Sequence, residues 1–234
     1  MAENGESNRT PVEKFILLFE AAKRSLLAAE ELLKRLTADL SALEQDIVGQ
    51  VQLDERAIGP LLSAVAFVDF AHRFGSIVDA LPLVSKSAPE LRQLRGTLRS
   101  IEDARNHLQH MRGDLSSNEA ILYPILGALS WSNGDNSYTV YMSQPAQTAA
   151  CSIVYDTQNR CWVCQHEYRL KDAAIDLDKV LAEMRNAYRF VSKSISDREF
   201  ASLRWGKTIA FAFVVNTNMQ GFKQAREPLE ITAQ

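Results

Sequence analysis

The sequence is poor in cysteine and has no segment that resembles a secretory signal. Its three cysteines, Cys151, Cys161 and Cys164, are an odd number and too few for a disulfide scaffold, which favours a reducing compartment. Residues 1–10 are polar and lack the apolar core of a signal peptide, so we expect a disordered lead and a cytoplasmic protein. The late apolar run Ile209–Val215 is too short to cross a bilayer, and no membrane partner is expected.

Several motifs that carry enzyme chemistry are also missing. The chain has no glycine-rich phosphate loop, no Gly-x-Ser-x-Gly and no His-Glu-x-x-His. Cys161 and Cys164 form a Cys-x-x-Cys pair, but structural zinc needs two further ligands and no second such pair is present. We therefore expect neither a metal nor a cofactor. The net charge is -3, so the charge of the whole chain attracts neither nucleic acid nor a membrane, and any basic surface must be local.

The first half of the chain has strong helical periodicity. Apolar residues recur at three- and four-residue steps over residues 12–49, 55–83 and 87–112, which predicts three long helices in an antiparallel bundle. The second of these is apolar on more than one side, so we expect it to be the most buried. In the third, Ser87 and Glu90 fit a capping box at the start and Gly113 fits the end.

The second half of the chain changes character. Residues 121–170 contain short apolar runs between turn-forming residues, with a hairpin turn at 133–136, and predict a small antiparallel β meander. Residues 175–195 predict a returning helix, whereas residues 205–216 fit either a strand or a helix. The expected fold is α+β and predominantly helical. Its expected parts are a lead (1–10), a helical bundle (11–115), the β meander (116–172), and a returning helix with a C-terminal segment on the same core (173–234).

The third predicted helix carries a basic stripe. Residues 86–112 contain six basic and three acidic residues, although the whole chain is acidic. At about 100° per residue, its apolar residues gather on one side and its polar residues on the other. The polar side comprises Arg92, Arg95, Arg99, Asp103, Asn106 and His110. Such a stripe is either a solvated helix face or a phosphate-binding surface, and in the second case Arg95 and Arg99 are candidate substrate-binding residues.

Arg105 lies apart from this stripe, at the edge of the apolar side. A buried guanidinium needs a partner, because an unpaired buried charge is costly. One hypothesis is an ion pair with an acid on a neighbouring helix, for which Asp69 and Asp79 are candidates. The other is that Arg105 faces a cleft or a dimer seam and binds an anion there.

Two of the four histidines in the chain lie on the same predicted helix. His107 and His110 follow Glu102 and Arg105, and histidine gives and takes protons near neutral pH. Asn106 lies one turn before His110 and can fix its tautomer through a hydrogen bond. A base near an RNA 2′-hydroxyl and a cation at the phosphate are enough for strand cleavage without a metal. These residues are therefore candidates for catalysis or for contact with a substrate. They are Glu102, Arg105, Asn106, His107 and His110.

The sequence Arg105-Asn106-x-x-x-His110 resembles the RNxxxH form of the motif of the HEPN family (higher eukaryotes and prokaryotes nucleotide-binding domain). The resemblance covers residues 11–115 and extends to the returning helix at 175–195, whereas the β segment departs from the minimal pattern of the family. It implies a helical bundle that dimerises and cleaves RNA without a metal, in a cleft lined by the motif residues of two protomers. By the same resemblance Arg105 and His110 are the catalytic pair, Asn106 is the polar residue beside the arginine, and Glu102 and His107 are left as substrate contacts. Many members are toxins or defence proteins. The resemblance thus implies a metal-independent endoribonuclease acting on RNA or a nucleotide, with an antitoxin protein as a further partner and no role for DNA.

Two other functions fit the same residues. A non-catalytic dimeric module would bind a partner through the β segment and use Arg105 and His110 only for structure. A binder of small anions would use the stripe of Arg92, Arg95 and Arg99. Because Arg105 and His110 lie about 140° apart on one helix, the catalytic hypothesis needs either a long reach by Arg105 or a second copy of the helix.

Overall fold

The computed structural model describes most of the chain between Pro11 and Ser196. The described residues are 11–50, 53, 55–116, 124–134, 136–142, 153 and 155–196, without the side chains of 111–116 and 195–196. The predicted lead at 1–10 and the ambiguous segment at 205–216 lie outside the described residues, so both interpretations stay predictions.

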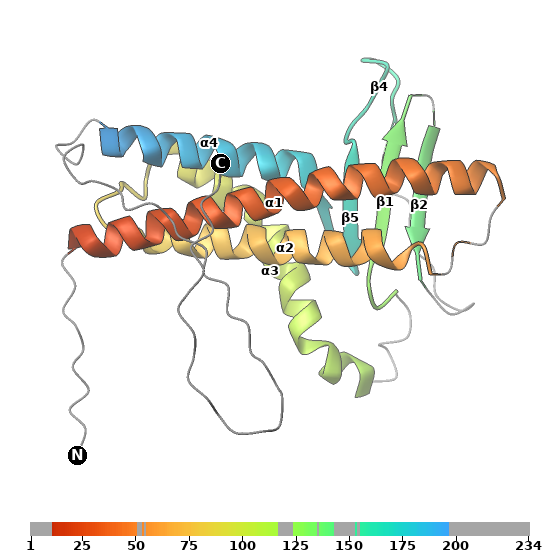
Figure 1. Ribbon diagram of the computed structural model, residues 1–234, viewed down its shortest axis with the longest axis horizontal. Coiled ribbons are helices and arrows are strands. Elements are labelled where there is room, and N and C mark those ends of the chain that lie inside the picture. The colour runs from red at the N-terminus through yellow and green to blue at the C-terminus, as the bar shows by residue number, and fades with distance from the viewer. Residues whose placement is uncertain are drawn as a thin grey trace, which may run out of the picture. The chain divides into compact units, whose positions relative to one another are not determined.

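Helices make up most of the described chain. They are α1 (Pro11–Val48), α2 (Ile58–Ala80), α3 (Pro89–Ser116) and α4 (Leu177–Ser196). α1 packs antiparallel along α2, and α4 runs beside α1 (Figure 1). The α+β, predominantly helical fold is therefore confirmed, with helix bounds within a few residues of those that periodicity predicts.

α2 supplies the centre of the core. Its Leu61, Phe67 and Phe74 are fully buried. It is the one described helix that is long and apolar enough to cross a membrane by length and composition, and 44% of its most apolar window is buried inside the fold. The outward side of α2 is partly apolar as well, because Ile58 and Leu62 are 36% and 50% exposed.

The predicted capping box of the third helix is wrong. α3 begins at Pro89, and the Ala88 carbonyl accepts the first helical hydrogen bond, from the Arg92 amide at 3.0 Å. Proline suits a first helical position because no N–H is needed there. The hydroxyl of Ser87 instead lies 3.0 Å from that of Ser85.

α3 passes very close to α2 and then runs further than predicted. A Cβ atom on Gly75 of α2 would lie 2.3 Å from Cδ1 of Leu98, so only glycine permits this approach without repacking. At its other end α3 continues through Gly113 to Ser116. The predicted end at Gly113 is wrong because one glycine inside a helix costs only about 1 kcal/mol.

The predicted small antiparallel sheet is confirmed, with four strands, but their order β2-β1-β5-β6 is not that of a meander, so the predicted strand order is wrong. Its strands are β1 (Ala128–Asn133), β2 (Asn136–Tyr141), β5 (His166–Leu170) and β6 (Ala173–Asp176). The predicted hairpin joins β1 to β2, but β1 also pairs with β5. The intervening β3 (Tyr155–Asp156) and β4 (Cys161–Trp162) form a separate two-stranded sheet.

The returning helix α4 begins two residues later than predicted, because the predicted start at residue 175 falls within β6. The carboxylate of Asp176 caps α4 by accepting a hydrogen bond from the Lys179 amide at 2.9 Å.

β1 begins directly after a tight turn. Gly127 turns the chain with a φ of 74°, and the strand begins at the next residue, Ala128. The hydroxyl of the fully buried Tyr168 donates a hydrogen bond to the Leu126 carbonyl at 3.0 Å and fixes this turn against β5.

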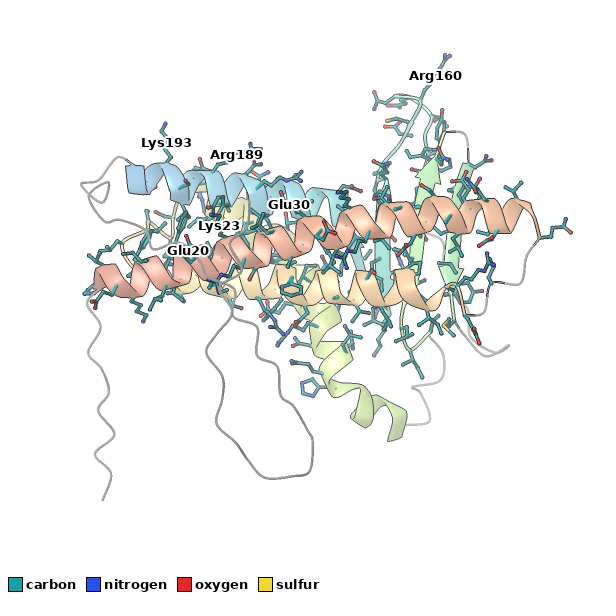
Figure 2. All side chains as sticks on the ribbon, viewed as in Figure 1. Glu20, Lys23, Glu30, Arg160, Arg189 and Lys193 are labelled. Carbon is teal, nitrogen blue, oxygen red and sulfur yellow. The ribbon has the colours of Figure 1, made fainter. Side chains whose placement is uncertain are left out.

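Polar side chains tie the helices to the sheet and to one another. Glu44 on α1 accepts hydrogen bonds from Asn133 at 2.8 Å and from the hydroxyl of Tyr138 at 3.1 Å, which holds α1 on the β1–β2 hairpin. Arg185 on α4 forms an ion pair of 2.7 Å with Glu30 on α1. Figure 2 shows Glu30 between these two helices.

Candidate functional site

Arg105 lies where α3 meets α2. Its Nε atom is 3.6 Å from Oδ1 of Asp69, so one of the two acids named as candidate partners is confirmed. The same carboxylate binds Arg73 at 2.6 Å through its other oxygen. The side chain of Arg105 is 29% exposed, which places the guanidinium half-buried at the α2–α3 junction.

The protein satisfies this guanidinium only in part. The Nε atom of Arg105 is buried and donates no hydrogen bond within the described part of the chain, because 3.6 Å to Asp69 is too long for one. When its amide oxygen is turned toward the guanidinium, Gln109 accepts hydrogen bonds from the two terminal nitrogens at 3.2 and 2.9 Å. Because a guanidinium has five N–H donors, Arg105 retains capacity for an anion.

His72 on α2 joins the same junction, although the sequence motif does not contain it. It is half-buried and follows Asp69 by one helical turn. Burial lowers the pKa of His72, and the nearby charge of Arg105 lowers it further, whereas the carboxylates of Glu102 and Asp69 raise it. We call Asp69, His72, Glu102 and Arg105 the junction cluster. The one clue in the sequence is the three-residue spacing between His72 and Asp69, the acid already named as a partner for Arg105.

His110 lies elsewhere on α3. The second half of this helix extends away from α1 and α2 (Figure 1), and His110 and Asn106 are both exposed on it. Arg105 turns instead toward Asp69 and Gln109. A single chain therefore does not bring the predicted pair of Arg105 and His110 together.

The predicted substrate contacts have different surroundings. Glu102 is exposed and close enough to His72 to influence its pKa, so it belongs to the junction cluster. Arg99 is exposed and His107 is half-buried. Arg95 already has protein partners, because its guanidinium lies 2.8 Å from Asp79 and donates a 2.8 Å hydrogen bond to the Lys86 carbonyl. The basic stripe is thus interrupted at Arg95, which holds the end of α2 to the start of α3.

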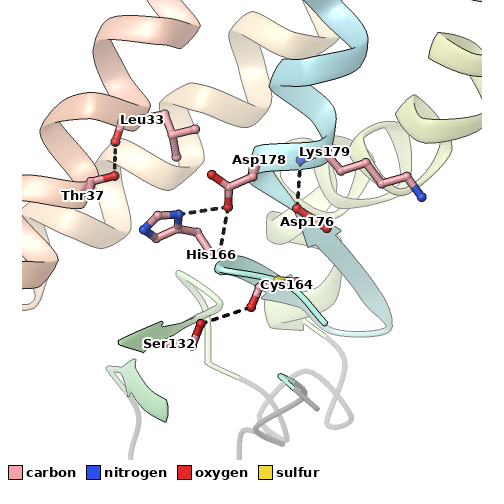
Figure 3. Close-up of polar contacts among 8 residues, drawn as sticks. All are labelled: Leu33, Thr37, Ser132, Cys164, His166, Asp176, Asp178 and Lys179. Carbon is pink, nitrogen blue, oxygen red and sulfur yellow. Dashed lines mark hydrogen bonds and ion pairs between the residues drawn. The ribbon is translucent and has the colours of Figure 1, made fainter. Parts of the chain in front are cut away.

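A second polar cluster joins β5 to α4. The buried His166 places its Nδ1 atom and its backbone amide nitrogen each 3.0 Å from Oδ2 of Asp178 (Figure 3). Asp178 lies in the first turn of α4, where the helix dipole favours a carboxylate. Burial, together with nearby carboxylates, raises the pKa of Cys164 to about 12. Cys164 is therefore a protonated thiol near neutral pH and not an activated nucleophile.

The two described cysteines should differ in reactivity as a result. Cys161 is exposed, whereas Cys164 is half-buried with a raised pKa. We expect iodoacetamide at pH 8 to alkylate Cys161 at least about tenfold faster than Cys164, because only the thiolate reacts and very little of Cys164 is thiolate at that pH. Peptide mass spectrometry over a time course measures both rates in one sample. Equal rates would contradict the raised pKa.

Among the described residues, no group of three histidine, cysteine, aspartate or glutamate side chains is arranged to hold a metal ion. The half-buried and incompletely satisfied guanidinium of Arg105 makes this residue and its neighbours the strongest candidate site. Comparisons with protein-family models, with curated proteins and with solved structures found no match to this chain.

Proposed function

We propose that this protein is a cytoplasmic, homodimeric, HEPN-like endoribonuclease that cleaves RNA without a metal. The observation that carries the proposal is the half-buried and incompletely satisfied guanidinium of Arg105. Arginine suits this role because its planar fork binds two phosphate oxygens and stabilises the charge that builds up on them during cleavage. The Arg105-Asn106-x-x-x-His110 sequence supports the same assignment by resemblance.

The proposed site needs a second copy of the chain. Arg105 faces α2, and His110 is exposed about 140° away around α3. A two-fold dimer in which the second halves of α3 meet would bring His110 of the partner subunit to Arg105, twice per dimer. Ile58 and Leu62 lie on the same side of α2 as Asp69 and supply exposed apolar surface for such a contact.

Four of the predicted residues then have distinct roles. Arg105 binds the scissile phosphate, and His110 of the partner subunit gives a proton to the leaving 5′-oxygen. Asn106, one turn before His110, orients the imidazole. Arg99 binds a neighbouring phosphate of the RNA.

The direct test is cleavage of a mixed set of structured and unstructured RNAs by the purified protein in excess EDTA. We expect products that end in a 2′,3′-cyclic phosphate and a 5′-hydroxyl, because RNA supplies its own nucleophile. A single 2′-deoxy nucleotide at the cleavage site should block the reaction. Expression without an antitoxin partner should slow growth.

Intact RNA together with harmless expression would refute the ribonuclease. If the same protein still formed a stable dimer, a non-catalytic interaction module would be the better account. The exposed Ile58 and Leu62 of α2 would then belong to the dimer interface, and Arg105 would serve only to join α2 and α3.

A further inference from the structure

The junction cluster contains a proton acceptor that the Arg-x-x-x-x-His pattern does not include. We propose that His72 is the general base of the reaction, which takes the proton from the RNA 2′-hydroxyl while Arg105 of the same protomer holds the phosphate. This inference rests on the ribonuclease function proposed above and assigns a further catalytic residue to the same site.

The position of His72 carries the inference. Asp69 lies one turn before His72 on the outward side of α2, and Asp69 is the carboxylate that pairs with Arg105. The imidazole and the guanidinium therefore lie at the same α2–α3 junction, although they come from different helices. The side chain of His72 is only half-buried, so part of it is accessible to a substrate.

The surrounding charges keep the imidazole in the form that a base needs. Arg105 and Glu102 act on it from α3, and Asp69 acts from α2. Burial and the guanidinium charge outweigh the two carboxylates, so the pKa of His72 falls below its usual value. A neutral imidazole at neutral pH can accept a proton, whereas a cationic imidazolium cannot.

The proposed step is a transesterification within the RNA. The neutral ring nitrogen of His72 takes the 2′-hydroxyl proton as the 2′-oxygen forms a bond to phosphorus. The bond between phosphorus and the 5′-oxygen breaks, and His110 of the partner subunit, as an imidazolium, donates a proton to that oxygen. The products are a 2′,3′-cyclic phosphate and a 5′-hydroxyl, and His72 passes its proton to solvent before the next turnover.

Two RNA substrates distinguish a general base from a general acid. One is an RNA with the ordinary 5′-oxygen at the cleavage site, and the other carries a bridging sulfur in its place. Because a thiolate leaves without protonation, the sulfur substrate needs no general acid but still needs a base. We expect His72→Gln to cleave both substrates about 100-fold more slowly than the wild type. We expect His110→Ala to be slow on the oxygen substrate and restored on the sulfur substrate.

The pH dependence gives a second readout that a structural role would not change. In the wild type, the rate should fall as the pH drops through the pKa of His72, which lies below the ordinary value of about 6.5. In His72→Gln this acidic limb should disappear. Thermal melting of His72→Gln, whose side chain stays polar and similar in size, checks that the fold survives.

The outcomes separate this inference from the proposed function. Wild-type rates in His72→Gln, or rescue of that variant by the sulfur substrate, would overturn the assignment of His72 alone, provided that Arg105→Ala is inactive. If the wild type cleaves neither substrate, the ribonuclease proposal fails, and the role of His72 fails with it.

Discussion

Arg105→Ala is expected to lower the rate of RNA cleavage by at least about 100-fold, because the phosphate loses its positive partner in the transition state. The same change should lower the free energy of unfolding by only about 1 kcal/mol. The ion pair with Asp69 is long, at 3.6 Å, and its side chains are 29% and 36% exposed, so water screens it. Single-turnover cleavage and urea unfolding measure the two effects on one preparation.

A matched control is available on α4. Arg185-Asn186 repeats the dipeptide of the motif, and Arg185 also forms an ion pair between helices, with Glu30. Arg185→Ala should change stability about as much as Arg105→Ala and leave cleavage intact. The opposite pattern for Arg105, a loss of several kcal/mol with unchanged cleavage, is what a purely structural role predicts.

Gly127→Ala is expected to cause the largest loss of stability, about 2–4 kcal/mol. The residue has a φ of 74°, which strains any side chain. A Cβ atom there would also lie 2.6 Å from the Arg169 carbonyl oxygen and 2.8 Å from the hydroxyl of Tyr168. Both contacts belong to β5, so the substitution should push β5 away from the turn that precedes β1.

Gly134→Ala separates the effect of the positive φ from the effect of the steric clash. Gly134 has a similar φ of 56°, but nothing lies within 4 Å of a Cβ built on it. This variant should lose only about 1 kcal/mol in urea unfolding. Equal losses at Gly127 and Gly134 would show that close packing against Tyr168 is not the cause.

The helices and the first hairpin could be predicted from the sequence because their causes are local. Apolar spacing places α1 to α4 within a few residues, and the turn around Gly134 places β1 beside β2. The pairing of β1 with β5 joins segments far apart in the chain, and no local pattern specifies it. The helix ends were missed where Pro89 and Gly113 behaved differently from the expected capping residues.

The candidate site could likewise be predicted only where its cause is local in the sequence. The position of Arg105 at the edge of an apolar helix face suggested an acidic partner on a neighbouring helix, and Asp69 is that partner. His72 could not be predicted, because its relation to Arg105 exists only after α2 packs on α3. The angle between Arg105 and His110 on one helix already indicated that a single chain cannot form the proposed catalytic site. The different surroundings of the two residues in the structure agree with that expectation.

The central claim is that Arg105 of one protomer works with His110 of the partner subunit. Its most direct test is to mix the inactive variants Arg105→Ala and His110→Ala, allow the subunits to exchange, and measure RNA cleavage. Random pairing makes half of the dimers mixed, each with one intact site of two, so the account predicts recovery to about a quarter of the wild-type rate. Cleavage no higher than that of the separate variants, after exchange is verified, would contradict it.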